Sequence, residues 1–242
     1  MLVEVCANSV SSAKIAQAAG ADRIEFCSEL AVGGITPSLG MLTQVLEEVR
    51  IPVHVLIRPR SGDFCYDASE FKAMLRDIAL AREAGVAGIV SGVLFQDGSL
   101  DMERTQILKE AAGDSTFTFH RAFDRCPEPE KVLEQLETLG PMYILSSGQA
   151  SNATAGLSTL VGLAAQARNC KFMPGAGIGP DNAGLFADAG FTAIHLSGVQ
   201  VPQEQELFHG PAMNSPGMLR ETSPLLSDAT RISETVHRIK AI

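Results

Sequence analysis

Short runs of apolar and β-branched residues alternate with longer amphipathic segments along the chain. Such alternation is typical of repeated βα units built on a parallel sheet. The pattern therefore predicts a single (β/α)8 TIM-like barrel over residues 1–242, with any site at the C-terminal mouth. The eight predicted strands are Leu2–Ala7, Asp22–Cys27, Pro52–Arg58, Ala87–Gly92, Thr116–Arg121, Met142–Ser147, Lys171–Pro174 and Thr192–Ser197.

Helix signals fall between these strands. Asp67 is followed three residues later by Glu70, which is the pattern of a capping box. Two further helices are expected to start at Thr36–Pro37 and Pro180–Asp181, and the last helix is expected near Thr230–Ile239. The helix before each even-numbered predicted strand should end at a glycine, and these glycines are Gly20, Gly85, Gly140 and Gly190.

Residue parity along the strands predicts which side chains enter the barrel. Side chains alternate between the two faces of a strand, and the face covered by helices must be apolar. Val3 and Val5 on the first strand therefore face outward, which leaves Glu4 and Cys6 inside. The same argument places these residues inside: Arg23, Glu25, Cys27, His54, Leu56, Arg58, Thr116, Thr118, His120, His195 and Ser197. The predicted inner wall is unusually polar.

Composition and charge narrow the functional classes. The chain is 45% hydrophobic and 19% charged, as expected for a globular protein. Its net charge of −9, without a basic tract, argues against nucleic acid and anionic membranes as partners. Neither a signal peptide at Met1–Ala7 nor a membrane-spanning stretch is apparent, so a soluble, cytoplasmic protein is expected. The five cysteines form no CxxC pair and are expected to be thiols.

Cys6 and Cys27 end two adjacent predicted strands and are the candidate metal ligands. Paired thiolates, with a histidine nearby, suit Cu(I) or zinc. The alternative is that both cysteines fill the barrel interior as small hydrophobic residues. The residue pattern leaves both interpretations open.

A second candidate is an anion site, made by basic side chains and two glycine-rich turns that follow the sixth and seventh strands. Backbone NH groups in such turns can hold phosphate or carboxylate. The predicted site comprises Arg58, Arg60, Arg121, Ser147, Gly148, Gly175 and Gly177. Alternatively, the arginines pair with carboxylates such as Glu25 or Asp124, and the glycines serve only the turns.

A third candidate is acid–base catalysis at the mouth. His120 with Glu25 or Asp124 could transfer protons near neutral pH, and Arg58 would complete a catalytic set of His120, Glu25 and Arg58. The alternative is that His120 is a structural donor inside the barrel. His54 lies deeper, and a structural role is expected for it.

Several long motifs resemble the CutC family: Pro59–Phe64, Phe119–Asp124, Gly33–Ser38 and Met173–Gly177. The match extends through Glu4–Cys6, Arg23–Ser28, Asp101–Arg104 and His195–Gly198, and so covers most of residues 2–198. The resemblance implies a cytoplasmic, usually oligomeric TIM-like barrel with a role in copper homeostasis. It also implies copper binding, because Cys6 and Cys27 coincide with the motif cysteines proposed as copper ligands. Residues 200–226 match poorly apart from Phe208–Gly210, and a long irregular segment is expected over 200–227.

Two functions from different classes follow. One is a copper homeostasis protein that holds Cu(I) on Cys6 and Cys27. The other is a barrel enzyme that acts on a small anionic or phosphorylated metabolite with His120 and Arg58. The expected partners are accordingly a small anion or a metal ion, within a homo-oligomer. The residues beyond the two cysteines exceed what Cu(I) needs, because Cu(I) is satisfied by two or three soft ligands.

Overall fold

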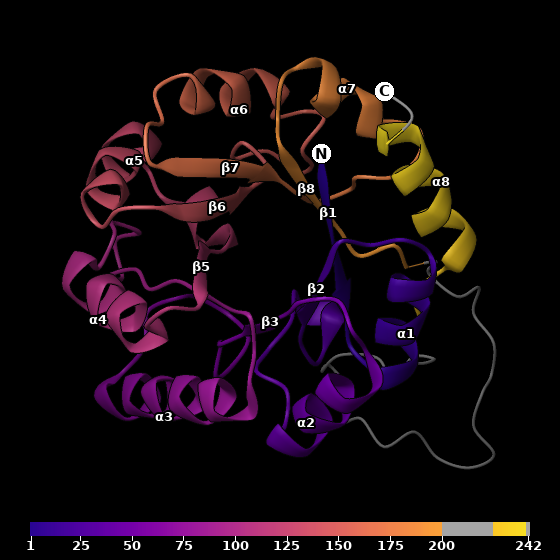
Figure 1. Cartoon of the computed structure of the whole chain (residues 1–242). Helices are drawn as coiled ribbons and strands as arrows, with labels where there is room; N and C mark the ends of the chain where they lie inside the picture. Colours follow the sequence, from indigo (N-terminus) through magenta and orange to yellow (C-terminus); the bar gives the residue numbers. More distant parts are fainter. Residues whose placement is uncertain (200–224, 241–242) are drawn as a thin grey trace, which may run out of the picture.

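Eight parallel strands form a barrel in the computed structural model, which describes residues 1–199 and 225–240 (Figure 1). The backbone ladder runs from β8 through β1 to β7, and β7 and β8 lie in contact where the ring closes. The predicted TIM-like barrel is therefore confirmed. The strands are β1 (Leu2–Ala7), β2 (Arg23–Phe26), β3 (Val53–Leu56), β4 (Gly88–Ser91), β5 (Thr116–Phe119), β6 (Met142–Ser146), β7 (Cys170–Pro174) and β8 (Ala193–Leu196).

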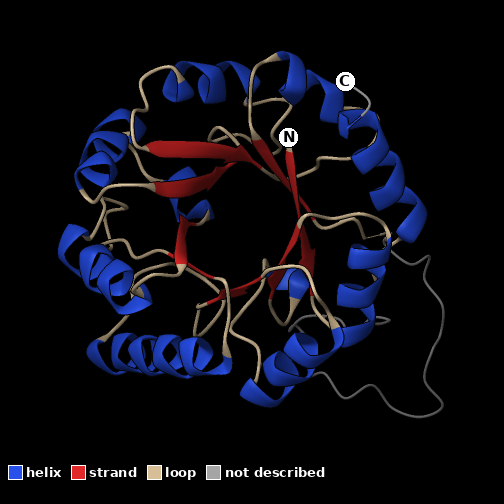
Figure 2. Cartoon of the chain, viewed as in Figure 1, coloured by secondary structure: helices blue, strands red, loops and turns tan. Residues whose placement is uncertain are grey.

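An outer ring of α-helices covers the strands (Figure 2). Two short 3-10 helices, η1 (Leu30–Val32) and η2 (Arg121–Arg125), lie in the loops after β2 and β5. No helix in the described part of the chain is long and apolar enough to cross a bilayer. The α-helices are α1 (Val10–Ala18), α2 (Leu39–Glu48), α3 (Ala68–Ala84), α4 (Met102–Ala112), α5 (Pro129–Thr138), α6 (Leu157–Ala164), α7 (Ala183–Asp188) and α8 (Ala229–Lys240).

The predicted helix ends are largely confirmed. The Asp67 side chain accepts hydrogen bonds from the backbone of Ser69 and Glu70, and the Glu70 side chain accepts one from Asp67, which completes the capping box. The four glycines before even-numbered strands all have positive φ: 92° at Gly20, 95° at Gly85, 84° at Gly140 and 85° at Gly190. This left-handed conformation is the one that ends a helix at glycine.

Two helix starts are corrected. Helix α2 begins at Leu39, with Ser38 as its cap, because two hydrogen bonds join Thr36 to Arg58, just after β3. Helix α7 begins at Ala183 rather than Pro180, because the backbone and side chain of Asn182 close a turn onto Gly179 first. In both places a contact outside the helix moves its first residue.

The fifth strand is also shorter than predicted. It ends at Phe119, because His120 accepts a hydrogen bond from the backbone of Ala122 and caps η2, so Arg121 belongs to that 3-10 helix. The predicted irregular segment, 200–227, lies mostly outside the described residues, as does the Phe208–Gly210 motif. At its described end, Val199 pairs with Ser227 in an antiparallel bridge. The single domain over 1–242 stays a prediction.

The packing of the strands confirms the predicted outward and inward faces. Outward residues such as Val5, Ile24 and Phe119 belong to the main hydrophobic core between strands and helices. Glu4, Arg23, Glu25, His54 and His120 are buried on the inner side of the barrel. Two small apolar clusters also occupy the interior, one of Cys6, Cys27, Leu56 and Val90 and one of Leu145, Met173 and Ala193.

Candidate functional site at the barrel mouth

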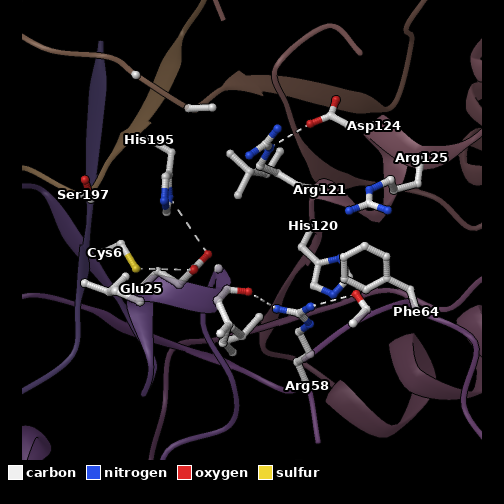
Figure 3. A pocket seen from close by; sticks show the side chains of 18 residues that line it. Cys6, Glu25, Arg58, Phe64, His120, Arg121, Asp124, Arg125, His195 and Ser197 are labelled. Carbon is white, nitrogen blue, oxygen red and sulfur yellow. Dashed lines mark hydrogen bonds and ion pairs between the residues drawn. The ribbon is translucent and has the colours of Figure 1, made fainter. Parts of the chain in front are cut away.

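A cavity of about 350 Å³ opens at the carboxyl ends of the strands, a size suited to a small ligand. Parallel strands bring their final side chains together at this edge, which is why residues distant in sequence line one space. Figure 3 shows Cys6, Glu25 and His195 on one side of the cavity and Arg121, Asp124 and Arg125 on the other.

The first side contains a cluster of potential metal ligands. Cys6 and Glu25 are register partners on β1 and β2, and the Cys6 Sγ lies 3.8 Å from Glu25 Oε1. The Cys6 and Cys27 sulfurs are 3.5 Å apart. Cys6, Glu25 and His195 each offer a ligand atom, and these atoms lie within 4.8 Å of one another. Thiol, carboxylate and imidazole together form a donor set typical of transition metals.

Glu4 lies one alternation deeper in the barrel than Cys6 and contacts this cluster through His195. Its Oε1 is 2.8 Å from His195 Nδ1, and its Oε2 accepts a hydrogen bond of 2.6 Å from Arg23 Nε. Burial alone would raise the pKa of Glu4, but the His195 hydrogen bond and the Arg23 charge lower that pKa to about 2. Burial opposes protonation of His195, yet the Glu25 and Glu4 carboxylates raise its pKa above the ordinary value. Glu4 thus orients the imidazole and leaves Nε2 available.

Burial affects Glu25 and Cys6 differently from Glu4, because their charged forms have fewer stabilising partners. The Glu25 Oε2 atom is buried without a hydrogen-bond partner among the described residues. Burial raises the pKa of Glu25 to about 7. The hydrogen bond to Cys27, together with burial, raises the pKa of the Cys6 thiol well above its ordinary value. Without a bound cation, the cluster therefore favours a protonated Cys6.

His120 is a neutral imidazole at the far side of the cavity. Its Nδ1 accepts a hydrogen bond of 3.2 Å from the Ala122 backbone, which assigns the proton to Nε2. That Nε2 is buried and has no partner among the described residues. Burial, and then the charge of Arg58, lower the pKa of His120 to about 3. At neutral pH its Nε2–H is a hydrogen-bond donor.

Arg58 lines the cavity, but its guanidinium is hydrogen-bonded to backbone carbonyls. Its Nη1 donates to the carbonyls of Val32 and Gly34, both at 2.9 Å, and its Nη2 donates to Gly62 at 3.1 Å. Its guanidinium also lies 5.0 Å from the centre of the Phe64 ring. Arg58 therefore ties together the loops after β2 and β3, a role that the sequence pattern did not indicate.

The other two predicted arginines differ from each other. Arg60 forms ion pairs with Glu70 and Asp63 and does not line the cavity. Arg121 does line it, and its Nε donates to Asp124 at 2.8 Å while its Nη2 donates to the Ser147 hydroxyl at 3.0 Å. The structure thus brings Arg58 and Arg121 to the cavity and places Arg60 outside it.

The two predicted glycine-rich turns also differ. The Asp124 carboxylate occupies the first, accepting hydrogen bonds from the Ser146 hydroxyl at 2.6 Å and from the Ser147 backbone at 3.0 Å. Neither Ser147 nor Gly148 lines the cavity. In the second turn Gly177 lines it, whereas Gly175 does not, and a Cβ at Gly175 would lie 2.5 Å from Leu145. Packing therefore explains Gly175 without a ligand.

Sequence reasoning placed His195 inside the barrel but did not include it among the metal ligands. The signal was its register with Glu4, since β8 pairs with β1 and the two residues are direct partners. Strand pairing across the seam between the first and last strands is a tertiary property, so spacing along the chain does not reveal it.

The fold and this cluster define a TIM-barrel protein with thiol, carboxylate and imidazole groups at its mouth. The chain belongs to the CutC family, whose model matches residues 1–200. A CutC family protein from Salmonella enteritidis is 48% identical over 202 residues, 83% of this chain and 82% of the relative. One from Citrobacter koseri is 43% identical over 235 residues, 96% of this chain and 95% of the relative.

Solved structures agree with this assignment. The CutC structure from Streptococcus agalactiae has a TM-score of 0.76 and 32% identity, covering 81% of this chain and 98% of that one. Thiamine phosphate pyrophosphorylase from Pyrococcus furiosus has a TM-score of 0.61 at 13% identity, covering 99% of this chain and 96% of that one. At that identity the second likeness shows the fold alone.

Proposed function

We propose that this protein binds Cu(I) at the barrel mouth through Cys6 and Cys27, with His195 beside Cys6, as a cytoplasmic, homo-oligomeric member of a copper homeostasis system. The observation that carries the proposal is the 3.5 Å separation of the two sulfurs beside the cluster of Cys6, Glu25 and His195. The name of the Streptococcus agalactiae relative, which refers to copper homeostasis, supports it.

The surroundings of the sulfurs suit a soft cation. Both cysteines are buried with Leu56 and Val90 in a small apolar cluster, and Cys6 also lines the cavity, from which a cation can reach it. Two thiolates satisfy Cu(I), whose preferred ligands are soft and few, and the His195 imidazole lies close to Cys6. Because the pKa of the Cys6 thiol is raised, binding must release a proton, so Cu(I) affinity should increase with pH.

Competition against a coloured Cu(I) chelator tests the proposal on reduced protein. The parent should withdraw one equivalent of Cu(I) from the chelator, and the Cys6→Ser/Cys27→Ser variant should withdraw none. His195→Gln should weaken binding without abolishing it, because two thiolates remain. The matched control is Cys65→Ser/Cys126→Ser, which removes two thiols outside the cluster and should compete like the parent.

Two outcomes would count against copper at Cys6 and Cys27. Equal competition by the parent and the Cys6→Ser/Cys27→Ser variant would make these thiols packing groups of the interior. Loss of binding in the control variant instead would place any copper at Cys65 or Cys126. A circular dichroism melt of each variant separates loss of ligands from loss of fold.

A second candidate function, an enzyme acting on a small anionic metabolite, is favoured by a different observation. Glu25 Oε2 and His120 Nε2 are both buried without hydrogen-bond partners in the described part of the chain, and a Cu(I) site requires neither atom. Glu25 would transfer the proton and His120 Nε2–H would donate a hydrogen bond to the substrate, while Arg58 would hold the loops that form the cavity. Turnover in a metabolite screen that is lost in His120→Gln would support an enzyme, and retained turnover would exclude His120 from catalysis.

A further inference from the structure

The cavity has a second wall, away from the thiols, that copper binding does not use. His120, Arg121 and the turn at Ala176–Gly177 contribute to this wall. Figure 3 shows Arg121 and His120 across the cavity from Cys6 and Glu25. Apolar side chains, among them Val32 and Leu145, complete the lining.

We propose that this wall binds a small organic anion. Its carboxylate or phosphate group would lie against Arg121 and the Ala176–Gly177 turn, and a second acceptor oxygen of the same molecule would take the hydrogen bond of His120 Nε2–H. The inference is independent of copper binding, and it moves the centre of the predicted anion site from Arg58 to Arg121.

Arg121 is held in place for such contact. Asp124 and Ser147 accept from its Nε and Nη2, whereas its Nη1 has no acceptor among the described residues. Its side chain is 44% exposed, so a ligand can reach it. A guanidinium that is already fixed loses little conformational freedom when it binds a carboxylate or phosphate.

Asp124 also lines the cavity and offsets part of the Arg121 charge, but neutral donors stabilise its carboxylate oxygens as well. Besides Arg121, they accept hydrogen bonds from the hydroxyl groups of Ser146 and Ser147 and from the Ser147 backbone. The carboxylate is thereby fixed in the turn after β6, where it orients Arg121. The neighbouring Arg125 also lines the cavity and adds positive charge to the same side.

His120 is the second, separate observation that points to a ligand. A buried donor without a partner is unfavourable, since the group has lost its hydrogen bonds to water and gained none in the protein. His120 is 5% exposed, and its ring is fixed by the Ala122 hydrogen bond and by contact with Phe64 at 4.8 Å between centroids. An acceptor oxygen on a bound molecule would satisfy Nε2.

The size and lining of the cavity favour an organic molecule over an inorganic ion. A cavity of about 350 Å³ is larger than one phosphate or sulfate requires. The turn that faces it is also unusual, because Ala176 has a φ of 79° and Gly177 a φ of 74°. Alanine in this region is strained, and such strain is concentrated at ligand sites.

Calorimetry on metal-free protein tests the proposal, with inorganic phosphate and phosphonoacetate as probes. Phosphonoacetate carries a phosphonate and a separate carboxylate that can accept the His120 hydrogen bond, so it should bind more tightly than phosphate. Arg121→Gln should weaken both probes by about 10- to 100-fold, the usual range for losing a hydrogen bond to a charged group. His120→Gln should remove only the advantage of phosphonoacetate over phosphate.

The matched control is Arg76→Gln on the exposed side of α3, which changes the net charge equally and should leave both affinities unchanged. Equal affinities in the parent and Arg121→Gln, or no saturable binding of either probe to the parent, would overturn the proposal. Should Arg121→Gln fail to fold, Arg121→Lys replaces it and should retain part of the phosphate affinity. Chelator-treated protein makes the result independent of whether copper binds.

Discussion

Two sets of buried polar residues lie one alternation apart on the same strands, and they differ in how completely they are paired. Glu4 on β1 and Arg23 on β2 form an ion pair of 2.6 Å, and His195 takes the other Glu4 oxygen. Two residues further along the same strands, Cys6 and Glu25 reach the cavity, where Glu25 Oε2 has no hydrogen-bond partner among the described residues.

The difference indicates that the paired residues serve the stability of the fold and that the incompletely paired residues are available to a ligand. A buried charge that is fully paired contributes to a specific fold, and removal of its partner is costly. A buried polar atom without a partner is unfavourable for stability and is retained where a ligand can satisfy it. The ion pair should therefore respond strongly to substitution in folding assays, and the mouth residues weakly.

Substitution of the ion pair should produce the largest effect. Arg23→Met should lower the free energy of unfolding by about 3–5 kcal/mol, because it leaves the Glu4 carboxylate buried beside fewer partners. Urea denaturation at neutral pH measures this change. The Glu4→Gln/Arg23→Met double variant, which removes both charges, should recover part of the loss. A loss below about 1 kcal/mol in Arg23→Met would show that the pair is dispensable.

An intermediate effect is expected from pH, through His120. The pKa of His120 falls from 6.5 to about 3 on folding. Between these values the unfolded chain binds a proton that the folded protein does not, so stability is present above pH 6.5 and is lost as pH falls. The slope should be about 1.4 kcal/mol per pH unit.

In His120→Gln this contribution should vanish, and the fall in unfolding free energy between about pH 6 and 4 should be shallower by that slope. Urea denaturation at both pH values provides the comparison. His54, whose pKa is lowered to about 4, contributes with the same sign in both proteins and remains as background. Parallel curves for parent and variant would show that His120 is not held neutral.

The smallest effect should come from Glu25, with the opposite sign. Burial raises the pKa of Glu25 from 4.5 to about 7, so the folded protein binds the extra proton and its stability decreases as pH rises through that window. Glu25→Gln removes the ionisation and should gain on the parent by on the order of 1 kcal/mol between pH 6 and 8. Thermal melts at both pH values check this, and a strong destabilisation at pH 8 would place Glu25 with the ion pair.

Much of the architecture could be predicted from local pattern. Alternation of strand and helix signals predicted the barrel, and parity predicted that Glu4, Arg23 and Glu25 face inward, because both depend on residues close in sequence. The Asp67 capping box and the helix-ending glycines are local in the same sense. The start of α2 was wrong because Thr36 pairs with Arg58, which lies 22 residues away.

The sequence by itself determined which residue types enter the barrel and at which end of each strand they lie. Only the tertiary structure decided their partners. Arg58 donates hydrogen bonds to loop carbonyls, Arg60 forms an ion pair with Glu70, and Arg121 lines the cavity. The physical reason is the distance along the chain over which each kind of interaction acts. Periodicity is set by backbone geometry within one element, whereas a guanidinium takes whichever acceptor the assembled loops bring within hydrogen-bond distance. The same holds for His195, which joins Cys6 and Glu25 only because the barrel closes β8 against β1.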